Sequence, residues 1–136
     1  MNLSAAERGD LTRLRLANAS QALADAMALR QADSIRGATN RAYYAMFYAA
    51  AALALQQGHS FKKHTGLIAY VHKEWVATGL LEKKHGRALQ RAFENRSESD
   101  YQDVLRLTGE DVDRLIADAI AFIETVQTML GASPKA

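Results

Sequence analysis

The placement of proline is the feature that most limits how this chain can fold. The one proline in 136 residues is residue 134. Because a proline breaks the interior of a helix, helices can run without interruption over almost the whole chain. Hydrophobic residues make up 49% of the sequence, and many of them are alanine, the strongest helix former. The sequence therefore predicts an all-α protein.

Hydrophobic periodicity and capping residues predict five helices. We expect them from about Ala5 to Leu29, from Asp33 or Ser34 to Gly58, from Thr65 to Ala77, from Glu82 to Arg96, and from Thr108 to Leu130. The polar stretch from Ser97 to Leu107 is expected to be a linker. We expect one domain, with a core at about 5–130 and a frayed tail at 131–136.

The second predicted helix is apolar on all sides. One face carries Ile35, Thr39, Ala42, Met46, Ala50 and Leu53, and the opposite face carries Tyr44, Tyr48, Ala51, Ala52 and Leu55. Such a helix lies in the middle of a bundle or in a subunit interface. It is therefore expected to be the central helix, with most of its aromatic side chains in the core.

Several classes of protein are excluded by composition. The chain has no cysteine, which excludes disulfides, zinc–thiolate sites and thiol nucleophiles. His64 and His72 are eight residues apart, too far for a pair of zinc ligands on one helix turn, so no metal or other cofactor is expected. Residues 1–8 lack the apolar core of a signal peptide, and no run of about eighteen apolar residues could span a membrane. We expect a cytoplasmic protein without membrane association.

Positive charge is concentrated in one segment. Residues 59–96 hold eight Lys/Arg against three acidic residues, and also all four histidines, although the net charge of the whole chain is only +2. Clustered positive charge is typical of a surface that binds a polyanion. A solvated helix face would give the same pattern, and both interpretations stay open.

Arg96 is the leading candidate for a phosphate contact. A guanidinium is a rigid, permanently charged fork of five donors that suits phosphate oxygens, and Arg96 follows the polar Asn95 at the predicted end of a helix. There it could stabilise charge on a phosphorus atom during phosphoryl transfer. Alternatively, Arg96 binds the carbonyls of its own helix or pairs with Glu98 or Asp100.

Other candidates surround this arginine in the sequence. Asp100 and Tyr101 could form a hydrogen-bonding pair beside it, with the tyrosine as donor to a phosphate oxygen, or Tyr101 could be a half-buried anchor of the linker. Arg91, His64 and Lys63 are further candidates for binding phosphate or a nucleotide. His64 could equally be a surface or helix-capping histidine.

Four short motifs resemble the small stand-alone HEPN proteins. They are Tyr43–Phe47 on the central helix, Lys63–Ile68 at the start of the next helix, Thr78–Leu81 at its end, and Arg96-x-x-x-Asp100-Tyr101. They occur in the family's order and span about residues 10–130. The resemblance implies an up-and-down bundle of four long helices plus one short helix, usually a homodimer.

Many HEPN proteins are metal-independent RNases, in which an arginine steadies the phosphate and a histidine four to six residues later assists attack by the 2′-hydroxyl. Two such motifs meet across a dimer in one composite site. By this resemblance Arg96 matches the arginine and Asn95 its polar neighbour, whereas Tyr101 occupies a position of the histidine. Nuclease activity therefore depends on whether His64 or another residue replaces it.

The resemblance also implies an alternative function. Some HEPN proteins form a toxin–antitoxin pair with a minimal nucleotidyltransferase, which can adenylylate a tyrosine near the motif. This chain would then be a non-catalytic partner that binds nucleotide or RNA, and Tyr101 would be the modified residue, although it is offset from the usual position.

Overall fold

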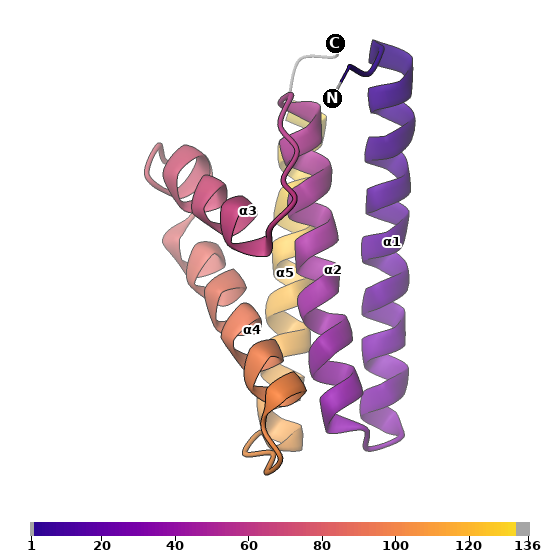
Figure 1. Ribbon diagram of the computed structural model, residues 1–136, viewed down its shortest axis with the longest axis vertical. Coiled ribbons are helices and arrows are strands. Elements are labelled where there is room, and N and C mark those ends of the chain that lie inside the picture. Colours follow the sequence, from indigo (N-terminus) through magenta and orange to yellow (C-terminus); the bar gives the residue numbers. More distant parts are fainter. Residues whose placement is uncertain (1, 133–136) are drawn as a thin grey trace.

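The computed structural model describes residues 2–132, and all regular secondary structure within them is helical. Figure 1 shows α1, α2 and α5 running side by side, with α4 inclined against them and α3 beside the bundle, next to the upper end of α4. This arrangement confirms the predicted bundle of four long helices and one shorter helical segment. The elements are α1 (Ala5–Gln31), α2 (Ile35–Gln56), α3 (His64–Tyr70), the π-helical turn η1 (Val71–Val76), α4 (Lys83–Tyr101) and α5 (Gly109–Ala132).

The first two helices form a tight antiparallel hairpin. A capping box starts α1, in which the Glu7 amide donates to Ser4 Oγ at 3.0 Å and the Ser4 amide donates to Glu7 Oε1 at 3.1 Å.

Where α2 begins, a Cβ atom on Gly37 would lie 2.9 Å from Ser34 Oγ and 3.2 Å from Leu29 Cδ1. Glycine at position 37 therefore lets the end of α1 approach α2 closely.

The second helix is the centre of the fold, as predicted. It packs against α1, α4 and α5, and most of its residues are buried, including Met46 and Leu53 with no exposed surface. Removal of this apolar surface from water supplies the main driving force for folding. Tyr44, Phe47 and Tyr48 depart from the expectation of an aromatic core, because all three remain only partly buried.

The third predicted helix is present at the expected position, but it is not a regular α-helix along its whole length. It begins at His64, and at Val71 it continues as a π-helical turn to Val76. Gln57, just after α2, holds this turn in place: its Oε1 accepts from Trp75 Nε1 at 2.8 Å and from the Tyr70 hydroxyl at 2.7 Å.

The predicted linker from Ser97 to Leu107 is wrong in its first half, because α4 continues to Tyr101. Ser99 in that stretch is 1% exposed. The guanidinium of Arg36 donates to three carbonyls at the end of α4, those of Ser99, Gln102 (2.8 Å) and Asp103 (3.1 Å). A cation that satisfies the last free carbonyls stabilises the end of a helix.

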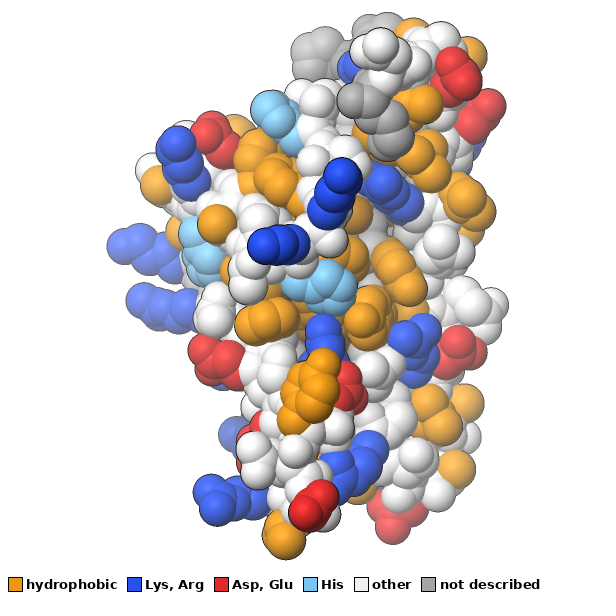
Figure 2. Space-filling view, in the orientation of Figure 1, with side chains coloured by type: hydrophobic (Ala, Val, Ile, Leu, Met, Phe, Trp, Pro, Cys, Tyr) orange, Lys and Arg blue, Asp and Glu red, His pale blue; other side chains and the backbone are white. Residues whose placement is uncertain are grey.

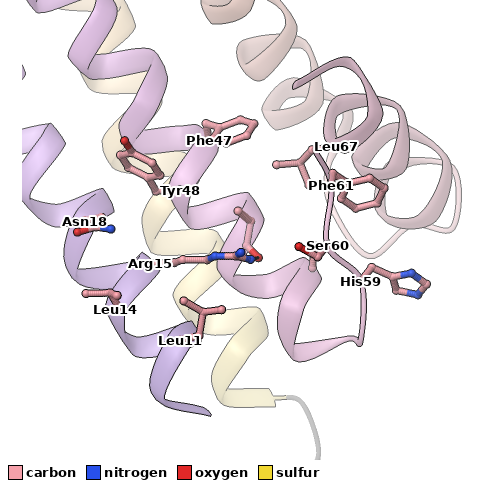
Figure 3. A pocket seen from close by; sticks show the side chains of 12 residues that line it. Leu11, Leu14, Arg15, Asn18, Phe47, Tyr48, His59, Ser60, Phe61 and Leu67 are labelled. Atoms are coloured by element: carbon pink, nitrogen blue, oxygen red, sulfur yellow. Dashed lines mark hydrogen bonds between the residues drawn. The ribbon is translucent and has the colours of Figure 1, made fainter. Parts of the chain in front are cut away.

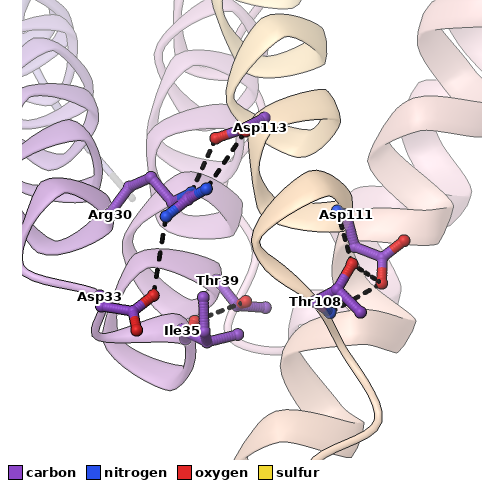
Figure 4. Close-up of polar contacts among 7 residues, drawn as sticks. All are labelled: Arg30, Asp33, Ile35, Thr39, Thr108, Asp111 and Asp113. Carbon is purple, nitrogen blue, oxygen red and sulfur yellow. Dashed lines mark hydrogen bonds and ion pairs between the residues drawn. The ribbon is translucent and has the colours of Figure 1, made fainter.

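The last helix starts as predicted. The Thr108 amide donates to Asp111 Oδ2 at 2.8 Å, and the Asp111 amide donates to Thr108 Oγ1 at 3.2 Å. Figure 4 shows this cap and the nearby contact in which Arg30 joins α1 to Asp113 of α5 at 2.8 Å. Of the tail predicted at 131–136, residues 131 and 132 belong to α5, and 133–136 lie outside the described residues.

Candidate functional site

Arg96 lies inside α4 rather than at its end, and only 13% of its side chain is exposed. Its guanidinium carbon lies 5.3 Å from the ring centre of Tyr43, 5.6 Å from that of Tyr44 and 6.0 Å from that of Phe93. Aromatic rings at such distances attract a cation. They therefore hold the Arg96 guanidinium in one place against α2.

His64, the first residue of α3, lies against this arginine. Its Nδ1 atom is 3.5 Å from Arg96 Nη2. The imidazole also stacks on Phe47, with ring centres 4.2 Å apart and an angle of 22° between the planes. The fold thus places beside Arg96 a histidine that precedes it by 32 residues, rather than one that follows it by four to six.

Tyr43 fixes the histidine ring. Its hydroxyl lies 2.7 Å from His64 Nδ1. Burial, partly offset by the charge of Arg96, raises the pKa of Tyr43 well above its usual value, so the phenol stays protonated. A phenolic hydroxyl can donate to an unprotonated nitrogen or accept from a protonated one. In either case Nδ1 is engaged and Nε2 is the ring nitrogen left for a ligand.

The same surroundings keep His64 uncharged. Burial lowers the pKa of the imidazole below its ordinary 6.5, and the positive charge of Arg96 lowers it further. At neutral pH the pair is therefore one cation beside one neutral ring. A neutral imidazole can accept a proton, which is what a general base requires.

Asp100 pairs with Arg96, as one of the alternatives from sequence predicted. Its Oδ2 atom lies 3.2 Å from Arg96 Nη1, one helical turn away. The Nε atom of Arg96 is buried and has no hydrogen-bond partner within the described residues. The guanidinium is thus paired with a carboxylate on one side and lies beside the His64 ring on the other.

Two predicted site residues lie on another side of α4. Arg91 pairs with Asp118 of α5 at 3.4 Å, and with Asn95 it lines a shallow surface pocket formed with α5. Arg91 precedes Arg96 by five residues, which on a helix is a rotation of about 140°. Arg91 and Asn95 therefore do not join the cluster of Arg96, His64 and Asp100.

Tyr101 and Lys63 lie at helix ends. The side chain of Tyr101 is 77% exposed at the last residue of α4 and makes no hydrogen bond with the described residues, so it does not anchor a linker. Lys63 is exposed directly before His64 at the start of α3. Both residues are open to a ligand or a partner, and among the described residues neither forms a hydrogen bond, ion pair or cation–π contact with Arg96.

The family of the chain follows from comparison with known proteins. The model of the HEPN domain matches residues 12–129, which is most of the chain. The chain belongs to the HEPN domain family. Among its relatives is a UPF0332 protein of Thermotoga maritima, which is 36% identical over 112 residues, 82% of this chain and 85% of that protein.

Two archaeal relatives are similar over comparable lengths. A protein of Methanocaldococcus jannaschii named "Putative toxin MJ0605" is 31% identical over 82% of this chain and 83% of its own length. A UPF0332 protein of Archaeoglobus fulgidus is 30% identical over 85% of this chain and 91% of its own length. The name of the first connects this HEPN chain with toxin-like relatives.

In this HEPN chain the residues that form the candidate site around Arg96 and His64 were only partly predictable from the sequence. Arg96, Asp100 and His64 were candidates, but Tyr43, Tyr44 and Phe47 were assigned mainly to the core. Figure 2 shows hydrophobic side chains gathered around a histidine in the middle of one face, with Lys and Arg side chains above and below. The sequence signal for these residues was the series of aromatic side chains that begins two residues after Arg41 on the predicted central helix.

Two further observations concern ligands and surroundings of the HEPN bundle. Among residues 2–132 no three His, Asp or Glu side chains are grouped as metal ligands would be. No helix in that part of the chain is both long enough and apolar enough to cross a membrane.

Proposed function

We propose that this HEPN protein is a metal-independent endoribonuclease of toxin–antitoxin type. The observation that carries the proposal is the 3.5 Å approach of His64 Nδ1 to Arg96 Nη2. This contact brings together an arginine and a histidine, the two groups that HEPN nucleases use, although Tyr101 stands where the histidine of the motif could be. Arg96 would bind the phosphate and His64 would move the proton.

The reaction is an attack by the 2′-hydroxyl on the adjacent phosphorus. The new O2′–P bond forms as the P–O5′ bond breaks, which gives a 2′,3′-cyclic phosphate and a 5′-hydroxyl. In the tautomer with its proton on Nδ1, that nitrogen donates to the Tyr43 oxygen and accepts nothing from Arg96, so His64 Nε2 is free to take the 2′ proton and then give it to the leaving 5′ oxygen. Arg96 would stabilise the charge on the phosphate oxygens.

The test is an RNA cleavage assay in the presence of a metal chelator. We expect the wild-type protein to cleave and Arg96→Ala and His64→Ala each to lose most of the activity, because a positioned general acid–base typically contributes about 10²–10⁴-fold. Arg91→Ala is the matched control: it removes an arginine of the same helix that faces α5 instead. Cleavage that survives in Arg96→Ala would contradict the proposal.

The alternative is a non-catalytic partner of a minimal nucleotidyltransferase that binds nucleotide or RNA. The 77% exposure of Tyr101 favours it, because that hydroxyl is accessible to a modifying enzyme. Wild-type protein that binds RNA and leaves it intact would support this alternative. Transfer of labelled nucleotide from ATP by such an enzyme, lost in Tyr101→Phe, would place the modification on this residue.

We further propose that the protein acts as a homodimer, with the Arg96 and His64 pairs of two copies in one composite site. The partly buried aromatic side chains of α2 support this, since they leave apolar surface beside the candidate site uncovered in the single chain. A mixed dimer of wild-type and Arg96→Ala chains should then retain reduced activity.

A further inference from the structure

A groove adjoins the Arg96–His64 pair and is not used by the proposed reaction. It lies between α1, α2 and the segment at 59–61, and has a volume of about 280 Å³. Phe47 connects the two places, because its ring lines the groove and stacks on His64 at 4.2 Å. Figure 3 shows the side chains that surround this space.

The lining combines flat apolar surfaces with polar groups. Phe47, Tyr48 and Phe61 contribute aromatic rings, while Arg15 and Asn18 extend from α1 (Figure 3). Proteins that hold single-stranded nucleic acid combine base–aromatic stacking with a positively charged groove for the backbone. Arginine and asparagine are also side chains that bind base edges by paired hydrogen bonds.

The polar side chains of the groove, Arg15 and Asn18, can form more hydrogen bonds than they make within the described residues. Arg15 Nη1 donates to the Ala51 carbonyl at 3.2 Å, and this is its one hydrogen bond within the described residues. The exposed amide of Asn18 makes none there. Burial lowers the pKa of Arg15 from its ordinary value, which means that its guanidinium is partly removed from water. A ligand with hydrogen-bond acceptors would satisfy these donors.

We infer that this groove binds the nucleobase of the nucleotide whose phosphate Arg96 holds. The inference rests on the proposed function, because that function supplies the phosphate next to the groove. Drug-sized ligands occupy pockets of about 300–1,000 Å³, and a groove of about 280 Å³ suits one nucleobase rather than a longer segment. The base of that nucleotide, stacked in the groove, would orient the RNA strand across His64.

The test compares ligands with and without a base. Binding of inorganic phosphate, adenosine 3′-monophosphate and uridine 3′-monophosphate is measured by isothermal titration. We expect at least one nucleotide to bind about tenfold or more tightly than phosphate, which corresponds to the usual strength of one base stack. Asn18→Phe fills the groove from an exposed helix position and should remove this advantage, whereas Ser20→Phe, at another exposed position of α1, should keep it.

The outcomes separate the two proposals. A wild-type protein without preference for nucleotide over phosphate, or an Asn18→Phe variant that keeps the preference, would overturn the nucleobase groove. Phosphate binding that is unaffected by Arg96→Ala would overturn the phosphate site instead. Loss of the nucleotide preference in Asn18→Phe, with phosphate binding unchanged, supports the groove.

Discussion

The hydroxyl of Tyr43 lies 2.7 Å from Nδ1 of His64, and this contact joins the buried face of α2 to the first residue of α3. The tyrosine belongs to the core and the histidine to the candidate site. The position of the His64 ring is therefore tied to the packing of α2 in the bundle.

Tyr43→Phe should release the histidine without disturbing the core, since it removes one oxygen from a fully buried ring. We expect the free energy of unfolding to fall by about 1 kcal/mol, the usual net value of one hydrogen bond. The pKa of His64 should move, and RNA cleavage should fall. NMR titration of the imidazole and denaturant unfolding would measure these effects. An unchanged His64 titration would show that the hydroxyl does not act on the ring.

The pH dependence of stability should carry a contribution from His64. Its pKa is lowered in the folded protein, so the unfolded chain takes up a proton first as the pH falls below 6.5. Because the unfolded state then binds more protons, stability decreases as the pH falls from 6.5 towards the lower folded pKa. His64→Gln should show a smaller loss of stability over that interval. Equal slopes for both proteins in urea unfolding would contradict this.

Asp100→Asn should strengthen anion binding at Arg96. The carboxylate lies 3.2 Å from Arg96 Nη1, where it occupies a donor and repels a phosphate. A pair of this kind is worth roughly 0.2–1 kcal/mol, so we expect phosphate to bind up to about fivefold more tightly by isothermal titration. Glu98→Gln removes the same charge from the same turn without that ion pair and is the control. Weaker binding in Asp100→Asn would mean that the carboxylate orients the guanidinium for its ligand.

Arg36→Ala should loosen the end of α4, because it removes the donor to three carbonyls. Hydrogen bonds to charged groups contribute about 1.5–3 kcal/mol, and we expect a loss of stability in that range. Hydrogen exchange of the amides near Ser99 and Gln102 should become faster. Arg36→Lys keeps the charge but lacks the forked geometry, so it should recover only part of the protection.

The oligomeric state is a separate prediction. Light scattering at micromolar concentration should give twice the mass of the chain. A monomer would remove the composite site, although the Arg96–His64 pair within one chain would remain.

The sequence predicted the fold better than it predicted the site. Alanine content, apolar periodicity and the capping residues at 108–111 are local signals, and the helices that depend on them were found. The end of α4 was not, because it depends on Arg36, which is more than sixty residues away along the chain.

In the cluster at Arg96, too, local contacts could be predicted from the sequence and contacts between distant residues could not. The contact with Asp100 follows from helical spacing and was among the alternatives from sequence. The contact with His64 depends on how α3 meets α4 and cannot be obtained from spacing alone. The separation of Arg91 from Arg96 follows from helical rotation, because five residues turn a helix by about 140°.

The π-helical turn contains the one tryptophan of the chain, Trp75, fully buried and hydrogen-bonded to Gln57. Intrinsic fluorescence excited at the indole therefore reports on a single place, where η1 rests on the end of α2. Detachment of that segment would change the emission even while the rest of the bundle stays folded. An optical signal and a whole-molecule signal such as circular dichroism would then distinguish local opening from global unfolding.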